Sequence, residues 1–421
     1  MKKALVYSHD TFGLGNIRRM LAICEHLLAS ISDLSILLVT GSPMVHSLRL
    51  PSRLDYIKLP CLTRTERESY AAKYLDIGID DAMRLRSDLI LHTVADFQPD
   101  LLLVDKKPYG INHELERTLR YLKRHHPATK QVLVLRDILD SPDVTRQVWQ
   151  QQGYYAAIQA LYDQVLVLGS PAIFNPVAEY AFPSAAAQKV RFTGYLRRAA
   201  GIQGRSAIRA HLQLADDQPL VLVTPGGGQD GYRLLDSYIT GLDHLPAGSN
   251  LHSVIISGPE LPEAQRRKLQ WATAHRPQLS AIEFTNDLMS YIEASDVVVS
   301  MGGYNTVCEI LSAGKRAVVV PRAKPVAEQW IRAERMAKLG LFTAIHPDAL
   351  IAQHLIDAVL AELHSASGQH GVPPQLDLDG LPNLAQSISR LLADQRCSLS
   401  SLAAAVSFAD ASPSIMYALS A

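Results

Sequence analysis

The sequence predicts an α/β protein built from two doubly wound parallel sheets. Short, almost continuous apolar runs alternate with amphipathic helical segments, and this alternation pauses once near the middle of the chain before it restarts. Parallel strands that helices cover on both faces read as such apolar runs. The length of 421 residues suits two domains of ordinary size.

The first domain is expected at residues 1–197. The segment after the first run places apolar residues at helical spacing, including Ile17, Met20 and Cys24. The alternation pauses in the glycine-containing stretch "KVRFTGYLRRAAGIQG", where we place the boundary. The expected strands of this domain are "KALVYS", "LSILLVT", "YIKLP", "LLLVD", "QVLVLRD" and "QVLVLGS".

The second domain is expected at residues 198–365, with residues 366–394 forming a loop and a final amphipathic helix. The Ser/Ala-rich tail, 395–421, has no periodicity that decides between disorder and a packed helix. The expected strands of the second domain lie in "PLVLVTPGGGQDG", "LHSVIISG", "AIEFT", "DVVVSMGG", "RAVVVPR" and "LFTAIHP".

Composition excludes several classes of protein. Lys+Arg and Asp+Glu both number 41, so no net charge favours nucleic-acid binding. The four cysteines form no CxxC pair, which indicates neither a zinc site nor a disulfide framework and fits a reducing cytosol. The first apolar run is too short for a signal peptide or a spanning helix. We expect a cytoplasmic protein, with attachment to a membrane surface left open.

The turn "SHDTFGLGN" joins the first strand to the first helix. It contains Gly13 and Gly15 but has Arg18 where a dinucleotide fingerprint has its third glycine, and no acid clearly ends the second strand. A P-loop motif is absent from the sequence. The alternative to a ligand-binding turn is a tight strand-to-helix turn that binds no ligand.

Two later turns suit a phosphate better. Gly226, Gly227 and Gly228 follow a buried run and allow close approach of a ligand to the backbone, although one glycine would suffice for a turn alone. In "DVVVSMGGYNTVCEIL", Gly302 and Gly303 turn the chain into a helix that starts around Asn305 and Thr306. The free N–H groups of such a helix start suit a diphosphate.

Acidic and amide side chains follow this helix start in a fixed order. Glu309 lies one helical turn after Asn305, where a carboxylate can accept hydrogen bonds from a ribose diol. The next strand leads to Glu328 and Gln329 at another helix start, and both can bind sugar hydroxyls. Taken singly, Glu309 and Gln329 could be ordinary surface residues; the ordered set indicates a nucleotide-sugar site.

"SMGGYNTVCEILSAGKRAVVVPR…EQ" resembles the donor-binding region of GT-B glycosyltransferases, in the group of the peptidoglycan N-acetylglucosaminyltransferase and the galactolipid synthases. Within that group the chain is most similar to a set of predicted bacterial glycosyltransferases. The resemblance includes "LVDKKPYGI", "LRDILDSP" and "FTGYL" and leaves out the tail. It implies two Rossmann-like domains facing across a cleft, with the acceptor on the first and the nucleotide-sugar on the second, and inverting transfer without a metal or other cofactor.

Carried over to this chain, the resemblance assigns the diphosphate to Gly226–Gly228 and to the turn 302–306. It assigns the ribose to Glu309 and the donor sugar to Glu328 and Gln329. The donor is expected to be a UDP-sugar. Segment 61–90 is expected to help shape the pocket of a small-molecule, glycan or lipid-linked acceptor.

The catalytic base is the point of departure from the resemblance. Relatives often have a histidine just after the last glycine of the first turn, where this chain has Asn16, whose amide is no useful base near pH 7. Asp105, His9 and Asp137 also end or follow strands of the first sheet, at the edge where ligands bind. We rank them in that order. Without a base, the chain could bind a nucleotide-sugar without transferring it, and a sugar-nucleotide 2-epimerase is a further alternative.

Overall fold

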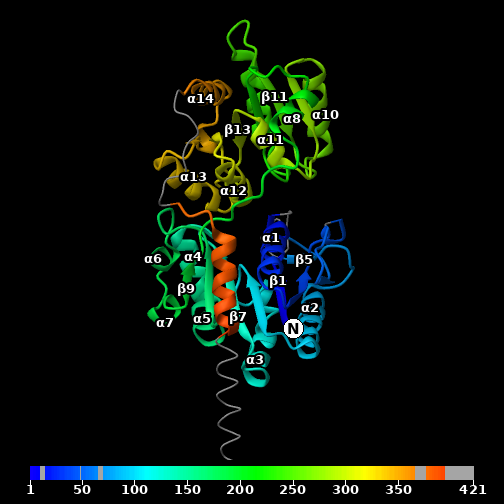
Figure 1. The fold of residues 1–421 in the computed structure, drawn as a ribbon, viewed down its shortest axis with the longest axis vertical. Helices are drawn as coiled ribbons and strands as arrows, with labels where there is room; N and C mark the ends of the chain where they lie inside the picture. Colours follow the sequence, from blue (N-terminus) through cyan, green and yellow to red (C-terminus); the bar gives the residue numbers. More distant parts are fainter. Residues whose placement is uncertain (10–14, 48, 65–69, 366–375, 394–421) are drawn as a thin grey trace, which may run out of the picture.

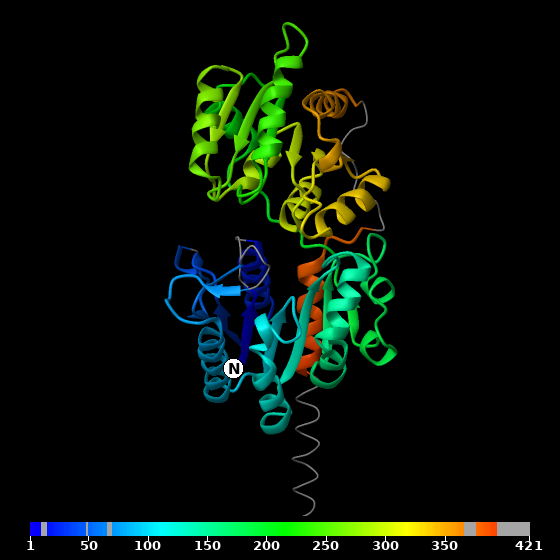
Figure 2. The same ribbon diagram turned by 180° about the vertical axis from the view of Figure 1, so that it is seen from behind.

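The computed structural model describes residues 1–9, 15–47, 49–64, 70–365 and 376–393. They form two lobes, one above the other in Figure 1 and Figure 2. Each lobe contains one parallel sheet with helices packed around it. Within these ranges, no helix combines the length and the apolar character that crossing a bilayer requires.

The first sheet has the strand order β3-β2-β1-β6-β7-β8-β9, and every neighbouring pair is parallel. All five residues of β6 are buried, which explains its uninterrupted apolar sequence. The strands are β1 (Lys2–Ser8), β2 (Leu34–Thr40), β3 (Leu54–Lys58), β6 (Leu101–Asp105), β7 (Lys130–Arg136), β8 (Gln164–Leu168) and β9 (Val190–Phe192).

The second sheet has the order β12-β11-β10-β13-β14-β15, also parallel throughout. Counted along the chain, its strand order is 3-2-1-4-5-6, and the first sheet has the same order with a seventh strand added at the end. This is the classic doubly wound arrangement. The strands are β10 (Leu220–Thr224), β11 (His252–Ile256), β12 (Leu279–Ile282), β13 (Val297–Ser300), β14 (Arg316–Val319) and β15 (Thr343–Ala344). The predicted fold class is therefore confirmed.

Helices connect the strands of both sheets. In the first lobe they are α1 (Gly15–Ser30), α2 (Ile79–Phe97), α3 (Glu116–His125), α4 (Pro142–Gln151), α5 (Tyr154–Leu161), α6 (Pro176–Glu179) and α7 (Ser184–Ala187), with short turns η1 (Val45–Ser47) and η2 (Ile111–His113). In the second they are α8 (Arg205–His211), α9 (Tyr232–Gly241), η3 (Leu242–His244), α10 (Glu263–Ala274), α11 (Leu288–Ala294), α12 (Tyr304–Ser312), α13 (Glu328–Lys338), η4 (Pro347–Ala349) and α14 (Ala352–His364).

A small antiparallel hairpin, β4 (Leu62–Arg64) and β5 (Tyr70–Ala72), stands apart from both sheets. It falls inside segment 61–90, which the sequence analysis associated with the acceptor without predicting a strand there. Residues 65–69 of that segment, and the tail from residue 394 onward, lie outside the described residues.

The last helix of the described residues, 380–393, lies beside the first lobe in both views. The chain returns at Asp379, which forms an antiparallel bridge with Leu196. Asn383 then donates from Nδ2 to the carbonyl oxygen of Thr193 at 2.9 Å. Three apolar residues of this helix, Leu384, Ile388 and Leu392, are fully or almost fully buried. The final helix thus completes the first domain, although it follows the second domain in sequence.

Candidate active site between the two domains

The strand order of each sheet reverses at one point. In the first sheet this switch point lies between the ends of β1 and β6, at His9 and Asp105; in the second it lies between β10 and β13, at Thr224 and Ser300. Doubly wound proteins bind ligands at such points, beyond the carboxyl ends of the strands. The two switch points meet, because Asn305 of the second domain donates from Nδ2 to the carbonyl oxygen of Gly15 at 3.0 Å.

The turn before α12 has two glycines with different constraints. Gly302 has φ +65°, and a Cβ there would lie 2.5 Å from Val319 Cγ1, so the fold itself demands glycine. Gly303 has φ −58°, and no atom lies within 4 Å of the position its Cβ would take. The described part of the chain therefore leaves open space over Gly303 at the start of the helix.

The electrostatics at the start of α12 suit an anion. Gly303 is the N-cap and has no side chain with which to accept hydrogen bonds from the N–H groups of the first turn. Asn305 and Thr306 lie in that turn, and both are partly exposed. The helix dipole adds partial positive charge at this end. The other glycine turn, 226–228, follows β10 at the same switch point, with Gly226 and Gly227 exposed and Gly228 buried.

Glu309 lies further along α12. Burial raises the pKa of its carboxyl group, and the guanidiniums of Arg198 and Arg18 oppose that rise. Arg198 comes from the segment that joins the domains and donates from Nη2 to Oδ1 of Asn305 at 2.8 Å. The expected ribose ligand and the expected diphosphate site thus share one cationic neighbour.

Glu328 and Gln329 begin α13, but their side chains have different surroundings. Glu328 is buried and forms ion pairs with Arg136 of the first domain and with Arg332, at 2.9 Å, on its own helix. Burial alone would raise the pKa of Glu328, but Arg136 and Arg332 lower it to about 2. Gln329 is partly exposed, and its Oε1 accepts a hydrogen bond from the backbone N–H of Arg322 at 3.0 Å. The carboxylate of Glu328, which was expected to hold the donor sugar, therefore already forms an ion pair between the two domains.

At the first switch point, His9 is almost completely buried. Its backbone N–H donates to Asp105 Oδ2 at 3.3 Å, while its ring Nδ1 has no hydrogen-bond partner in the described part of the chain. Burial first, then the charge of Lys106, lowers the pKa of His9 well below its ordinary value. The imidazole is therefore neutral at pH 7.

Asp105 and Asn16 surround His9. The carboxylate of Asp105 forms a buried ion pair with Arg19 at 2.8 Å. Asn16 donates from Nδ2 to the carbonyl oxygen of His9 and accepts from Arg19 Nη2 at 3.1 Å. Asn16 thus holds the backbone of His9 in place. The preceding residues of the opening turn, including Gly13, lie outside the described residues.

Asp137 is buried within the interface between the domains. Its Oδ1 forms an ion pair with Arg332 of the second domain at 3.2 Å, and its Oδ2 accepts a hydrogen bond from the Tyr195 hydroxyl. The side chain of Asp137 also packs against Gly169, where a Cβ would lie 2.5 Å from Asp137 Cβ. One oxygen of its carboxylate thus joins the two domains, while the other is held by Tyr195 within the first domain.

The sequence analysis did not single out the cations of this interface. Lys106 follows Asp105 with φ +72°, a strained conformation for lysine, and burial together with Arg136 lowers its pKa to about 7. Arg136 and Arg332 are the partners of Glu328. A basic residue directly after a predicted strand, as in "LVDKKPYG", was the available signal for Lys106. For Arg332 the available signal was its position four residues after Glu328 at an expected helix start.

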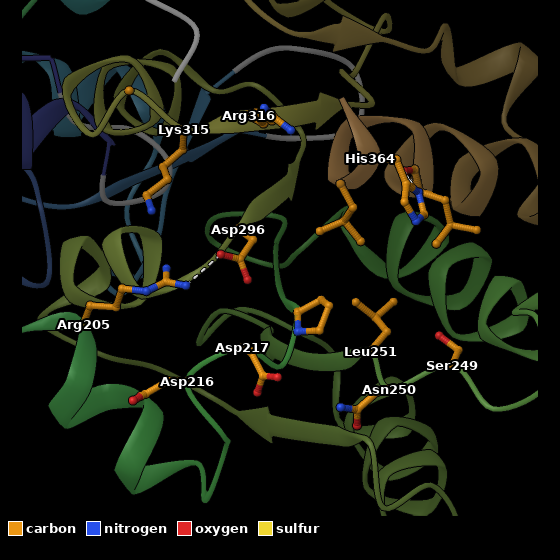
Figure 3. Close-up of a pocket in the computed structure, with 14 residues that line it drawn as sticks. Arg205, Asp216, Asp217, Ser249, Asn250, Leu251, Asp296, Lys315, Arg316 and His364 are labelled. Carbon is orange, nitrogen blue, oxygen red and sulfur yellow. Dashed lines mark hydrogen bonds and ion pairs between the residues drawn. The ribbon is translucent and has the colours of Figure 1, made fainter. Parts of the chain in front are cut away.

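A cavity of about 690 Å³ lies elsewhere in the second domain (Figure 3). Pro219, Asp296 and Arg316, which help line it, stand at the amino-terminal ends of β10, β13 and β14, opposite to the switch point. An ion pair between Arg205 and Asp296 at 2.8 Å occupies part of its wall. This cavity is therefore separate from the candidate active site. Within the described ranges, no group of three or more His, Cys, Asp or Glu residues could hold a metal ion.

The sequence is similar to those of known glycosyltransferases. Residues 220–376 match the model of the glycosyltransferase family 28 C-terminal domain. An uncharacterized glycosyltransferase of Methanopyrus kandleri is 28 % identical over 163 residues, 39 % of this chain and 43 % of that protein. The UDP-N-acetylglucosamine–N-acetylmuramyl-(pentapeptide) pyrophosphoryl-undecaprenol N-acetylglucosamine transferase of Clostridioides difficile is 24 % identical over 208 residues, 47 % of this chain and 50 % of that enzyme. The chain thus spans about half the length of these curated relatives.

Solved structures match over nearly the whole chain. MurG of Acinetobacter baumannii has a TM-score of 0.59 and 14 % identity, covering 93 % of this chain and 100 % of its own. UDP-GlcNAc 2-epimerase of Methanocaldococcus jannaschii has a TM-score of 0.59 and 10 % identity, with the same coverage. The fold is GT-B, as predicted. Within that fold, the chain resembles the glycosyltransferases of the MurG group, as its donor-region motif indicated.

Proposed function

We propose that the protein is an inverting glycosyltransferase that moves a sugar from UDP to an acceptor hydroxyl without a metal. The observation that supports it most is the uncapped start of α12, with open space over Gly303, placed against the switch point of the other domain. In this proposal the N–H groups of the turn 302–306 and of Gly226–Gly228 bind the diphosphate. They stabilise the charge that develops on it as it leaves.

Glu309 would bind the ribose and Gln329 the donor sugar. Glu328 would contact the sugar only through the oxygen atoms that its arginine partners leave free. A released diphosphate needs cations or N–H groups, and α12 together with Arg198 can supply both in place of a metal. Activity that survives EDTA would support this part of the proposal, and full loss would contradict it.

For the base we favour His9 over Asp105 and Asp137. Both carboxylates are held in ion pairs with buried arginines, whereas His9 is neutral and has an unpartnered ring nitrogen. Asp105 would then position His9 through its backbone N–H. Proton transfer to a positioned side chain typically contributes about 10²- to 10⁴-fold to a rate.

Binding of UDP, measured by isothermal titration calorimetry, is the direct test of the donor site. The wild-type protein should bind UDP, and Glu309→Ala should weaken the binding. Glu263→Ala on α10, which removes an exposed carboxylate of the same domain, is the matched control and should bind as the wild type does. Absence of binding at millimolar UDP, or equal binding by the wild type and Glu309→Ala, would refute the UDP-specific proposal.

Release of UDP from UDP-GlcNAc, with water as the acceptor, tests the chemistry. His9→Ala should slow release. The acid limb of the wild-type rate profile should lie below pH 6.5, because burial lowers the pKa of His9. Binding without release would favour a protein that only binds nucleotide-sugars, a candidate suggested by the contacts of Asp105 and Asn16 with Arg19, which engage both side chains. A 2-epimer of UDP-GlcNAc in the NMR spectrum would show an epimerase instead.

A further inference from the structure

Arg18 extends from the first domain toward the donor site of the second. It lies one turn along α1 from Gly15, the residue that contacts Asn305 of the second domain. Its guanidinium carbon is 5.6 Å from the centre of the Phe284 ring, in the loop that follows β12. Phe284 is 42 % exposed. A side chain of the acceptor domain thus stands over a surface of the donor domain.

The guanidinium of Arg18 is partly buried, and within the described residues it forms no ion pair or hydrogen bond. Burial lowers the pKa of Arg18. The carboxylate of Glu309 opposes this shift, and the charge of Arg198 adds to it. The charges of Arg18 and Arg198 therefore both act on one carboxylate, Glu309, and Arg198 also contacts Asn305 in the first turn of α12. Removing an arginine from water without a partner is unfavourable, so this arrangement suits a further anion at the same place.

We propose that Arg18 binds the diphosphate of the donor nucleotide, so that the first domain supplies a cation to the donor site. This inference rests on the proposed function. A guanidinium matches phosphate geometry with two parallel N–H···O bonds, and its flat face can rest on an aromatic ring while its edges bind oxygen atoms. Phe284 offers that ring, and the helix start of α12 offers the neighbouring N–H groups.

A consequence is that the donor binds to both domains at once. The diphosphate would bridge Arg18 on α1 and the N–H groups of α12, whose starts already touch through Asn305 and Gly15. Loss of one charge-assisted hydrogen-bonding group typically weakens binding by about 10- to 100-fold. The nucleoside part of the donor would be unaffected, because Arg18 contacts only the phosphates.

The test compares the dissociation constants of UDP and uridine for the wild type and Arg18→Ala, with UDP titrated directly and uridine measured by competition. UDP binding should weaken about 10- to 100-fold, with uridine unchanged. Arg124→Ala on α3, an exposed arginine of the same domain, is the control and should leave both constants unchanged. Should Arg18→Ala fail to fold, Arg18→Lys, which keeps the charge but not the fork of donors, should weaken UDP several-fold.

The outcomes separate the inference from the proposed function. Equal weakening of UDP and uridine would place Arg18 at the base or ribose, and unchanged UDP binding would place it outside the site; either result overturns the inference and leaves the proposed donor site intact. A wild-type protein that does not bind UDP would overturn both.

Discussion

The two domains share one strand order but use their switch points differently. At the switch point of the second domain the backbone is exposed, because the glycine turns and a helix start without a side-chain cap leave N–H groups open to a ligand. At the first, side chains are buried: Asp105 is paired with Arg19, and His9 is almost completely buried. One fold thus provides exposed backbone, which suits the proposed anion site, and, opposite to it, a packed cluster of charged and polar side chains.

The difference also explains how the domains are joined. Buried ion pairs from Arg136 to Glu328 and from Arg332 to Asp137 cross the interface beside the site. Arg332 and Arg19 also stand over the ring of Tyr304, at 5.4 and 6.0 Å from its centre. Tyr304, the first residue of the helix proposed to bind phosphate, is therefore held by cations of both domains.

The largest effect is expected from Arg332→Ala. It leaves two buried carboxylates, Asp137 and Glu328, without their shared partner, and breaking a buried pair typically costs about 3–5 kcal/mol. The free energy of unfolding from denaturant titration measures this. Lys338→Ala removes an exposed ion pair from the same helix and should cost no more than about 0.5 kcal/mol. Similar values for the two variants would show that the buried network does not stabilise the fold.

Acid should weaken the same network. The pKa of Glu328 is about 2 in the folded protein, against an ordinary value of 4.5, so its stabilisation is complete above pH 4.5 and is lost as pH falls toward 2. Between pH 5 and pH 3 this group alone should lower the free energy of unfolding by about 2 kcal/mol. Glu328→Gln should show a correspondingly shallower pH dependence over that range. An unchanged slope would contradict the shifted pKa.

Gly302 and Gly303 offer a sharper comparison between fold and function. Gly302→Ala places a Cβ 2.5 Å from Val319 Cγ1 at a positive φ, so unfolding should become easier by about 1–3 kcal/mol. Gly303→Ser introduces a preferred N-cap residue into open space and should leave thermal stability unchanged or raised. Its side chain should nevertheless weaken UDP binding. Unimpaired UDP binding by Gly303→Ser would argue against a ligand at the start of α12.

The smallest effect is expected at the rim of the interface. Arg335 of α13 forms a 2.7 Å ion pair with Glu179 of the first domain, but both side chains are about one-third exposed. Glu179→Ala should change the free energy of unfolding by no more than about 1 kcal/mol, and less in high salt. A loss as large as that of Arg332→Ala would mean that the stability of the interface is spread evenly rather than concentrated around Arg332.

Much of the fold could be predicted because strands such as β6 and β13 are buried on both faces and their apolar sequence records it. The hairpin of β4 and β5 could not, since its three-residue strands carry no periodicity. The glycine turn before α12 was visible because local backbone geometry demands glycine at position 302. The partners across the interface were not, because Arg136 and Glu328 are 192 residues apart, Arg332 and Asp137 are 195 residues apart, and both pairs meet only after the domains dock.

The bridge between Leu196 and Asp379 has a consequence for biosynthesis. A ribosome that has made the seven strands of the first sheet must still make the entire second domain before Leu384, Ile388 and Leu392 exist to cover them. At typical elongation rates of about 5–20 residues per second, that interval is on the order of 10–40 s. During it the nascent first domain exposes the apolar surface that helix 380–393 will bury, and exposed apolar surface of this kind promotes aggregation.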